Sequence, residues 1–228
     1  MKIHRFIDNF DLSKPELEIT GEISKQMALV LKLKVGEKIE LSDGTHISAI
    51  AYICKIDKKS VLVKIEKINK ILKNEKKVHL FCAVLKKENF ELVAQKATEC
   101  GVSKIIPIIT ERTIKTGINI ERLQKIAKEA SEQSGRMTVP EISEPIKFLE
   151  ALETIEGDSV LFDISGSEFT NNYQLKTKNL FIGPEGGWTK KEIELAKQNN
   201  FKIATLGPLT LRGETATIIA TYLVSNIK

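Results

Sequence analysis

The chain has 228 residues, of which 42% are hydrophobic and 29% charged, and its formal net charge is +5. This balance is typical of a globular protein, and because no apolar run reaches the roughly 20 residues of a membrane-spanning helix, we expect no membrane partner. The three cysteines and three histidines are scattered, so we also expect reduced thiols, no metal site and a cytoplasmic location.

The charge is distributed unevenly along the chain. Residues 1–75 carry 14 Lys and Arg against 11 Asp and Glu, residues 76–136 carry 12 against 7, and residues 137–228 carry 9 against 12. A basic middle beside an acidic end is typical of a protein whose polyanion-binding face lies apart from its small-ligand site. Lysine-rich solvated surfaces would give the same numbers, so charge alone does not decide the function.

Residues 1–70 are predicted to form a small β-rich domain. Three runs alternate apolar and polar residues as half-buried strands do: 38–41, 46–56 and 61–68. Turn signals at Asp43-Gly44 and at 57–60 separate these runs, and one helix is expected at 23–31. Several short strands joined by turns indicate a compact β-barrel, and the polar stretch 69–77 indicates a linker.

Residues 76–228 are predicted to form an α/β domain with a mainly parallel sheet. Five short apolar runs are nearly continuous, as in strands covered on both faces: 78–85, 104–109, 159–163, 179–183 and 202–206. Apolar residues recur at helical spacing in three segments: 90–97, 123–130 and 216–223. The last segment places Ala216, Ile219, Ala220 and Leu223 on one face. Thr189 and Glu192 form a capping box that opens a further helix.

Two segments rich in glycine and proline follow predicted strands and precede predicted helices. Residues 182–188 read Ile-Gly-Pro-Glu-Gly-Gly-Trp, and residues 206–216 read Leu-Gly-Pro-Leu-Thr-Leu-Arg-Gly-Glu-Thr-Ala. Such loops lie at the carboxyl ends of strands, where α/β sheets bind ligands, and glycine lets their backbone approach a ligand closely. Neither segment has the Gly-Lys-Ser/Thr of a P-loop or the GxGxxG of a dinucleotide site. A ligand that is neutral or cationic at its core therefore fits better.

These two segments resemble the signature of the SPOUT superfamily of RNA methyltransferases. More narrowly, the chain resembles the ribosomal RNA small subunit methyltransferase E family, whose members make N3-methyluridine in 16S ribosomal RNA. Three upstream segments fit the same family: 95–107, 110–113 and 129–140. The resemblance implies a PUA-like RNA-binding β-barrel at 1–70 and a SPOUT α/β domain at 76–228, with a parallel sheet and a C-terminal trefoil knot. It also implies S-adenosyl-L-methionine as methyl donor, 16S rRNA or the small ribosomal subunit as partner, and a homodimer.

The resemblance further implies that strand ends and both loops hold the donor. The residues concerned are Leu161, Phe162, Asp163, Ile182, Gly183, Pro184, Glu185, Gly186, Gly187, Leu206, Gly207, Leu211, Thr215 and Ala216. Ile182, Leu206 and Leu211 would frame the adenine, and the glycines would let the backbone approach the donor. The alternatives are ordinary ones: turn glycines, buried strand ends and, for Asp163, a loop acid.

Arg212 is the principal catalytic candidate. Methylation at uridine N3 requires loss of the N3 proton, which places negative charge on the ring and its two carbonyl oxygens, and a fixed guanidinium can stabilise that charge. Glu185 or Glu214 can accept the proton, and the sequence does not choose between them or water. A structural ion pair is the alternative for Arg212. A carboxylate at a helix N-terminus is the alternative for Glu214.

Six residues are candidates for RNA contacts: Arg5, Lys34, Lys86, Arg112, Gln133 and Arg136. Gln133 and Arg136 are three residues apart at a predicted helix end, so they can share a face. Arg5 and Lys34 lie in the predicted barrel, where they can hold phosphates. Surface solvation is the alternative for all six. A uridine inside structured RNA would have to leave its stack to reach the donor.

The sequence departs from the family pattern at two positions of the second loop. Leu209 stands where a polar residue is usual, which puts one RNA contact in doubt, and Gly213 is expected to loosen the entry to the last helix. Two other functions stay open: a non-catalytic RNA-binding or ribosome-assembly factor, and a SPOUT methyltransferase that acts on another RNA.

Overall fold

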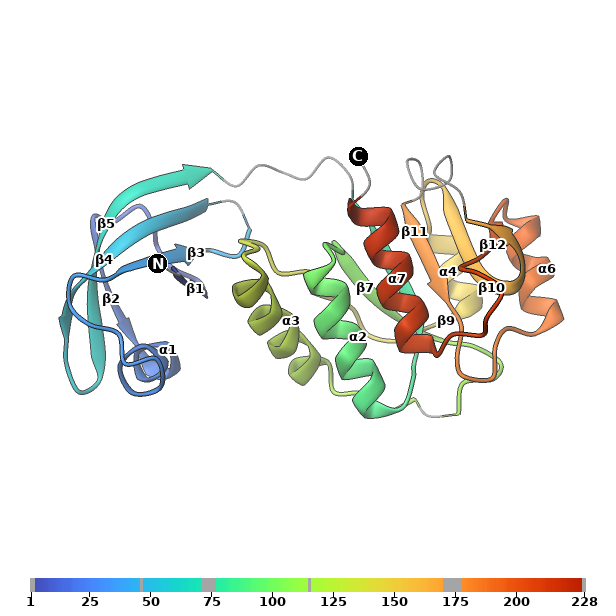
Figure 1. Cartoon of the computed structure of the whole chain (residues 1–228), viewed down its shortest axis with the longest axis horizontal. Helices are drawn as coiled ribbons and strands as arrows, with labels where there is room; N and C mark the ends of the chain where they lie inside the picture. Colours follow the sequence, from blue (N-terminus) through green and yellow to red (C-terminus); the bar gives the residue numbers. More distant parts are fainter. Residues whose placement is uncertain (1–2, 46, 71–76, 115, 170–177, 227–228) are drawn as a thin grey trace. The chain divides into compact units, whose positions relative to one another are not determined.

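The chain divides into two units, which we call the N-terminal unit and the C-terminal unit (Figure 1). The computed structural model describes residues 3–45, 47–70, 77–114, 116–169 and 178–226. Residues 1–74 and 131–139 form the N-terminal unit, and residues 75–130 and 140–228 form the C-terminal unit. Most of the linker predicted at 69–77 lies outside the described residues. Residues 131–139 belong to the N-terminal unit, although residues 75–130 of the C-terminal unit separate them in sequence from residues 1–74.

A five-stranded sheet forms the N-terminal unit, in the order β1-β3-β4-β5-β2. Its strands are β1 (His4–Ile7), β2 (Glu16–Thr20), β3 (Lys38–Ser42), β4 (Ile47–Ile56) and β5 (Ser60–Lys70). β1 runs parallel to β3, and the other neighbours are antiparallel. The predicted strands are confirmed within the described residues, because their alternate apolar side chains, such as Ile39, Leu41 and Ile53, fill one core. β1 and β2 were not predicted, since each is too short to show alternation clearly.

The helix predicted at 23–31 is confirmed, but its second half is π-helical. An α-helix, α1 (Gly21–Lys25), continues into a π-helical turn, η1 (Gln26–Val30), where Leu31 N donates to Gln26 O at 2.8 Å, five residues back. This widened turn buries Met27 completely and leaves Val30 72% exposed. A helical period of 3.6 residues therefore does not describe which side chains are buried here.

A seven-stranded parallel sheet forms the C-terminal unit, as the continuous apolar runs predict. Its strands are β6 (His79–Ala83), β7 (Lys104–Ile109), β8 (Glu141–Ile142), β9 (Ile146–Lys147), β10 (Ser159–Glu168), β11 (Asn179–Ile182) and β12 (Lys202–Thr205). The order is β12-β10-β11-β6-β7-β8, and β9 also pairs with β7. The carboxyl ends of β10, β11 and β12 consequently meet at one edge of the sheet.

Within the described part of the chain, five helices cover the two faces of this sheet (Figure 1). They are α2 (Lys87–Glu99), α3 (Ile120–Ser134), α4 (Phe148–Thr154), α6 (Lys190–Gln198) and α7 (Gly213–Asn226). α2 and α7 pack against each other, and Phe148 of α4 and Ala196 of α6 share a core with Phe81 and Phe181 of the sheet. The predicted capping box is confirmed, because Thr189 Oγ1 accepts a hydrogen bond from Glu192 N at 3.3 Å. None of the described helices has the length and apolar character to cross a membrane.

The buried face of α7 differs from the predicted one. Ile219 is 37% exposed, and the residues buried beside Ala220 are Thr217, Thr221 and Val224. Thr217 is tolerated inside because its Oγ1 donates to Gly213 O at 2.8 Å and lies 3.6 Å from Cys82 Sγ. Apolar spacing alone misplaced this face, because it did not count the threonines Thr217 and Thr221, which are both buried.

The chain crosses itself closely between β10 and β12. Ala204 pairs with Phe162 and again with Ser167, so residues 163–166 bulge out of the ladder. A Cβ atom at Gly166 would lie 2.5 Å from the backbone of Ala204, which leaves room only for glycine. The trefoil knot implied by the family resemblance stays a prediction, and this crossing lies in the segment where the knot is expected.

Candidate functional site

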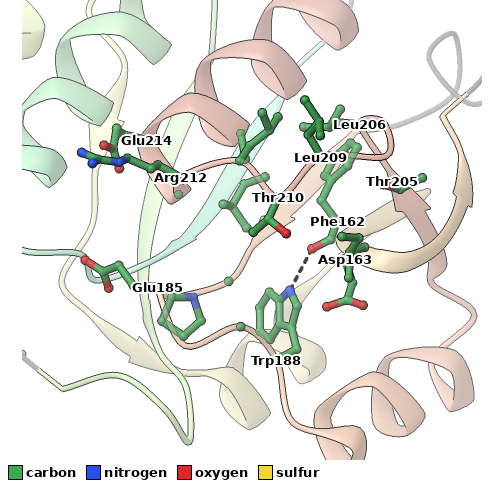
Figure 2. Close-up of a pocket in the computed structure, with 18 of the residues that line it drawn as sticks. Phe162, Asp163, Glu185, Trp188, Thr205, Leu206, Leu209, Thr210, Arg212 and Glu214 are labelled. Atoms are coloured by element: carbon green, nitrogen blue, oxygen red, sulfur yellow. Dashed lines mark hydrogen bonds between the residues drawn. The ribbon is translucent and has the colours of Figure 1, made fainter.

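A cavity of about 540 Å³ opens at the carboxyl ends of β10, β11 and β12 (Figure 2). Two loops supply most of its wall: the GPEGGW loop (residues 183–188), which follows β11, and the GPLTLR loop (residues 207–212), which follows β12. This is where open α/β sheets bind ligands, and the volume lies in the range of small-molecule sites. The two segments singled out in the sequence thus form one site.

Most residues predicted to hold a donor or to carry out chemistry line this cavity. They are Phe162, Asp163, Ile182, Gly183, Pro184, Glu185, Gly187, Leu206, Leu211, Arg212, Glu214 and Ala216. Lys86, predicted as an RNA contact, lines it too. Leu161 is instead fully buried in the core, and Gly186, Gly207 and Thr215 are not among the lining residues.

The GPEGGW loop is held by its own tryptophan. Trp188 Nε1 donates to Phe162 O at 3.0 Å, which ties the loop to the end of β10 (Figure 2). A Cβ atom at Gly183 would lie 2.9 Å from that Nε1, so glycine is required for the indole to lie where it does. Gly187 N donates to Pro184 O at 2.8 Å and closes a turn within the loop. Trp188 itself is 5% exposed and packs on Phe148 with ring centroids 5.2 Å apart.

The GPLTLR loop has fewer partners. Thr205 Oγ1 donates to Gly207 O at 2.8 Å, and Leu209 is 77% exposed although it lines the cavity. α7 begins at Gly213 and its first turn is closed, and the loosening expected at this glycine stays a prediction. Ala216 N donates to Arg212 O at 2.8 Å, and Thr217 Oγ1 donates to Gly213 O.

Charged side chains occupy both ends of the cavity. Figure 2 shows Arg212 and Glu214 at one end, with Glu185 below them and Asp163 across the cavity. Glu214 is only 8% exposed, whereas Arg212 and Glu185 are exposed. Among the described residues, no carboxylate forms a salt bridge with Arg212, so the ion-pair alternative is not what the structure shows.

Glu185 and Asp163 each accept backbone hydrogen bonds. Glu185 Oε1 accepts from Lys86 N at 3.3 Å, at the N-terminus of α2, where a negative charge is favoured. Asp163 Oδ1 accepts from Ser165 N at 2.9 Å. Within the described part of the chain, no group of three or more His, Cys, Asp or Glu side chains is placed to hold a metal ion. The site therefore offers two cationic side chains, Arg212 and Lys86, three carboxylates and apolar walls.

Comparison with known proteins gives the family. Residues 72–225 match the RNA methyltransferase domain, and residues 19–66 match the RNA methyltransferase PUA domain. The chain is 34% identical to the ribosomal RNA small subunit methyltransferase E of Rickettsia conorii, over 96% of this chain and 94% of the relative. The protein belongs to the ribosomal RNA small subunit methyltransferase E family. The family relative from Bacillus subtilis is 31% identical over 92% of this chain and 90% of its own.

Solved structures agree with this family and with the predicted fold. The Neisseria gonorrhoeae ribosomal RNA small subunit methyltransferase E, bound to S-adenosyl methionine, has a TM-score of 0.87 at 28% identity, covering 96% of this chain and 95% of that chain. A Legionella pneumophila protein in complex with the same cofactor has a TM-score of 0.88 at 30% identity, covering 98% and 97%. The prediction of a PUA-like domain followed by a parallel α/β methyltransferase domain is confirmed.

Three of the predicted RNA contacts of this family member gather in the N-terminal unit. The guanidinium of Arg5 lies against Gly135, where a Cβ atom would be 3.4 Å from Arg5 Cζ, and Ile7 N donates to Glu132 Oε1 at 2.8 Å. The end of α3, with Gln133 and Arg136, thus packs beside β1. Arg5 also pairs with Glu40, and burial lowers the pKa of the Arg136 guanidinium.

The other predicted RNA contacts of the family member lie elsewhere. Lys34 is exposed on the loop that follows η1. Arg112 lies in the C-terminal unit, where its Nη1 donates to Gly186 O at 2.8 Å. Lys86 belongs to the cavity wall. Lys34, Lys86 and Arg112 are thus exposed, whereas Arg5 and Arg136 are half-buried, and the RNA contacts expected of all of them stay predictions.

Several wall residues were not predicted from the sequence. They are Asn89, Ile164, Trp188, Thr205, Leu209, Thr210 and Gly213. Trp188 carried a signal that was available, because the single tryptophan of the chain directly follows the two glycines of the loop. Asn89 carried none, since only the packing of α2 beside the GPEGGW loop brings it to the cavity.

Proposed function

We propose that this protein transfers a methyl group from S-adenosyl-L-methionine to N3 of a specific uridine in 16S rRNA of the small ribosomal subunit. The observation that carries the proposal is the single cavity walled by both predicted loops, with Arg212 and Glu214 at one end. Family membership supports an rRNA substrate, and the S-adenosyl methionine bound to the Neisseria gonorrhoeae relative supports the donor.

The cavity suits this donor chemically. Ile182, Leu206 and Leu211 give apolar surface for an adenine ring, and the neighbouring backbone offers N–H and C=O groups to its edge. Asp163 and Glu185 provide negative charge for a ligand that carries an ammonium and a sulfonium group. When bound, S-adenosyl-L-methionine supplies an electrophilic methyl group.

The protein's own groups then act on the uridine. Loss of the N3 proton places negative charge on O2, N3 and O4, and the Arg212 guanidinium stabilises that charge at the end of the cavity. Glu214 accepts the proton in this scheme, because it is buried and lies beside Arg212. Glu185 is the second candidate base, although its Oε1 already accepts from Lys86 N.

The proposal is tested by nucleoside mass spectrometry. Unmodified 16S rRNA, free and as small subunits, is incubated with the protein and S-adenosyl-L-methionine, and we expect 3-methyluridine at one site. Donor binding without methylation of either substrate would overturn the substrate and redirect the search to transfer RNA. A methyl group on another atom of the base or ribose would overturn the N3 assignment.

Arg212→Ala tests the catalytic role. We expect turnover to fall by roughly 100-fold, as when one charge-stabilising donor is removed, while the donor Kd changes by less than about threefold. Arg122→Ala is the matched control, because Arg122 is an exposed arginine of the same unit that pairs with Glu91 on α2. A rise in donor Kd as large as the fall in rate would reassign Arg212 to donor binding.

RNA binding is assigned to the surface where β1 meets the end of α3. Arg5 and Gln133 lie on this surface within the N-terminal unit, beside Arg136. Arg5→Gln is expected to raise the RNA Kd and to reduce its salt dependence by about one phosphate contact, without changing donor affinity. An unchanged salt slope would remove Arg5 from the interface and leave it as the structural partner of Glu40.

A homodimer is proposed through the exposed apolar face of α2 and α7. Leu92, Ile219 and Tyr222 are 37%, 37% and 58% exposed, and the two helices that carry them pack side by side. Exposed apolar side chains that gather on one face mark interaction sites, which supports this face as the interface. Tyr222→Glu is expected to give a monomer by light scattering, and a dimer that survives this change would place the interface elsewhere.

A further inference from the structure

Arg112 lies on the turn that follows β7 and is not part of the cavity wall. Thr110 N donates to Thr113 Oγ1 at 3.0 Å, and Thr113 N donates to Thr110 O at 3.2 Å. These two bonds close a tight turn around Arg112. These local hydrogen bonds therefore fix the direction in which the Arg112 side chain leaves the turn.

The side chain of Arg112 runs along the GPEGGW loop. Its Nη1 donates to Gly186 O at 2.8 Å and to Trp188 O at 3.3 Å. A Cβ atom at Gly186 would lie 3.4 Å from Arg112 Cβ and 3.5 Å from its Cδ, so the aliphatic part of the arginine covers that glycine. One guanidinium thus bonds two carbonyls of the same loop, two residues apart.

The residue before Arg112 ties the same turn to the end of the loop. Glu111 N donates to Glu192 Oε1 at 2.9 Å, and Glu111 Oε2 accepts from Thr189 Oγ1 at 3.3 Å. Glu192 also accepts from Thr189 N at 2.8 Å through its other oxygen and is 5% exposed. The turn after β7 and the start of α6 therefore hold the GPEGGW loop between them.

The two sides of this loop have different tasks. Pro184, Glu185 and Gly187 face the cavity, whereas Gly186, whose carbonyl Arg112 binds, does not line it. We propose that Arg112 is a positioning residue, which fixes the back of the GPEGGW loop so that its front is preorganised for the donor. The inference rests on the proposed function, since it takes the cavity to be the donor site. It replaces the RNA contact predicted for Arg112 from the sequence.

Charge and geometry both favour arginine in this place. A charged donor makes stronger hydrogen bonds to carbonyl oxygens than a neutral one, and the planar guanidinium can serve two acceptors at once. A lysine can keep the charge but would bond the two carbonyls less well, and a glutamine would lose the charge. The order of donor affinity is therefore expected to be arginine, then lysine, then glutamine.

The test compares Arg112→Gln and Arg112→Lys with the unsubstituted protein and with Arg122→Gln. Calorimetry gives the donor Kd, the fluorescence of Trp188, the only tryptophan, reports the loop, and steady-state rates give KM for donor and for RNA separately. We expect Arg112→Gln to raise the donor Kd and KM by roughly 10- to 100-fold, as loss of hydrogen bonds from a charged group does. Arg112→Lys should be intermediate, Arg122→Gln unchanged, and the RNA KM unchanged throughout.

Several outcomes would overturn the inference. An Arg112→Gln variant that binds the donor normally but binds RNA weakly would restore the RNA contact. If Arg112→Gln and Arg112→Lys both have the melting temperature and the donor Kd of the unsubstituted protein, Arg112 has no positioning role. If Arg112→Gln does not fold, Arg112→Lys decides, because a donor Kd equal to that of the unsubstituted protein would contradict positioning. Failure of the unsubstituted protein to bind the donor would overturn the proposed function itself.

Discussion

The two loops of the cavity both begin with Gly-Pro, but they differ in the hydrogen bonds that hold them in place. The GPEGGW loop is bonded by Trp188 to β10, by Arg112 to the end of β7 and by Thr189 to the first turn of α6. The GPLTLR loop has the bonds between Thr205 and Gly207 and then runs exposed through Leu209 to α7. Both begin with Gly-Pro after a strand, so the difference comes from Trp188, which only the first loop contains, and from the neighbouring Arg112.

This difference in hydrogen bonding suggests different roles for the GPEGGW loop and the GPLTLR loop in ligand binding. A loop whose backbone is fixed before the ligand arrives costs little conformational entropy on binding, and it can set the position of the donor. A loop with few buried contacts opens at low free energy and can close over a ligand or admit a base. We infer that the GPEGGW loop is the preformed wall and the GPLTLR loop the adaptable one, which places Arg212 on the adaptable side.

Gly183→Ala should damage the preformed wall most. The new Cβ would lie 2.9 Å from Trp188 Nε1, so either the indole or the strand end must move. Overpacking of this kind costs about 1–3 kcal/mol, and donor affinity should fall by roughly tenfold or more. Calorimetry with S-adenosyl-L-methionine and thermal unfolding measure the two effects.

The matched control for this change is the double variant with Trp188→Phe. The smaller ring withdraws the atoms nearest to the new methyl group, so part of the lost stability should return. A double variant whose losses simply add would show that Gly183 and Trp188 are not coupled, and that the clash is relieved elsewhere.

Trp188→Phe alone should have the next largest effect. It leaves Phe162 O without its indole donor at the end of β10, which costs about 1–3 kcal/mol when an acceptor stays buried and unpaired. We expect a lower melting temperature and weaker donor binding, with the RNA Kd unchanged. An unaltered donor Kd would mean that the tie to β10 stabilises the fold and does not shape the cavity.

The sequence predicted the strands and loops of this site well, but it predicted poorly the contacts that other parts of the chain make with them. Continuous apolar runs gave the parallel strands, and Gly-Pro segments at their ends gave the cavity, because both follow from local chemistry. The contact of Arg112 with Gly186 O depends on β7 lying two strands from β11, and the place of Asn89 depends on the packing of α2. Residues far apart in sequence form those contacts, so no local sequence pattern could predict them.

The buried face of α7 and the π-helical turn at η1 show a second limit. On α7, apolar residues at helical spacing were taken to mark one face, and the structure buries a partly different set; at η1, a π-helical turn replaces the regular helical period. Thr217 and Thr221 are buried on α7, while Leu29 and Val30 are exposed near η1. Period predicts which side faces a core only when the helix is regular and its buried face is apolar.

Leu209→Ser tests whether the GPLTLR loop contributes less to stability than the GPEGGW loop does. Because Leu209 is 77% exposed, the free energy of unfolding should change by less than about 0.5 kcal/mol. Its place in the cavity wall predicts a donor Kd raised by only a few fold. Chemical denaturation and calorimetry make the comparison with Trp188→Phe direct. A large loss of stability would show that the GPLTLR loop is braced as firmly as the GPEGGW loop.

The smallest effect is expected at the opposite end of the sheet. His79 begins β6, away from the carboxyl ends that form the cavity. Burial lowers its pKa below 6.5, helped by the positive charge of Lys104 and Lys77 and opposed by a hydrogen bond with Asn179 and by Glu141. The unfolded chain then binds the proton more readily, so this contribution to stability is present above pH 6.5 and is lost as pH falls through the folded pKa.

Thermal unfolding between pH 5 and pH 8 measures this contribution, with His79→Asn as the variant that cannot titrate there. The unsubstituted protein should lose slightly more stability on acidification than His79→Asn does, whereas the donor Kd of the two should follow the same pH profile. A pH profile of donor binding that changed with His79→Asn would couple the two ends of β6. The GPEGGW loop would then depend on the far end of the sheet as well as on its immediate neighbours.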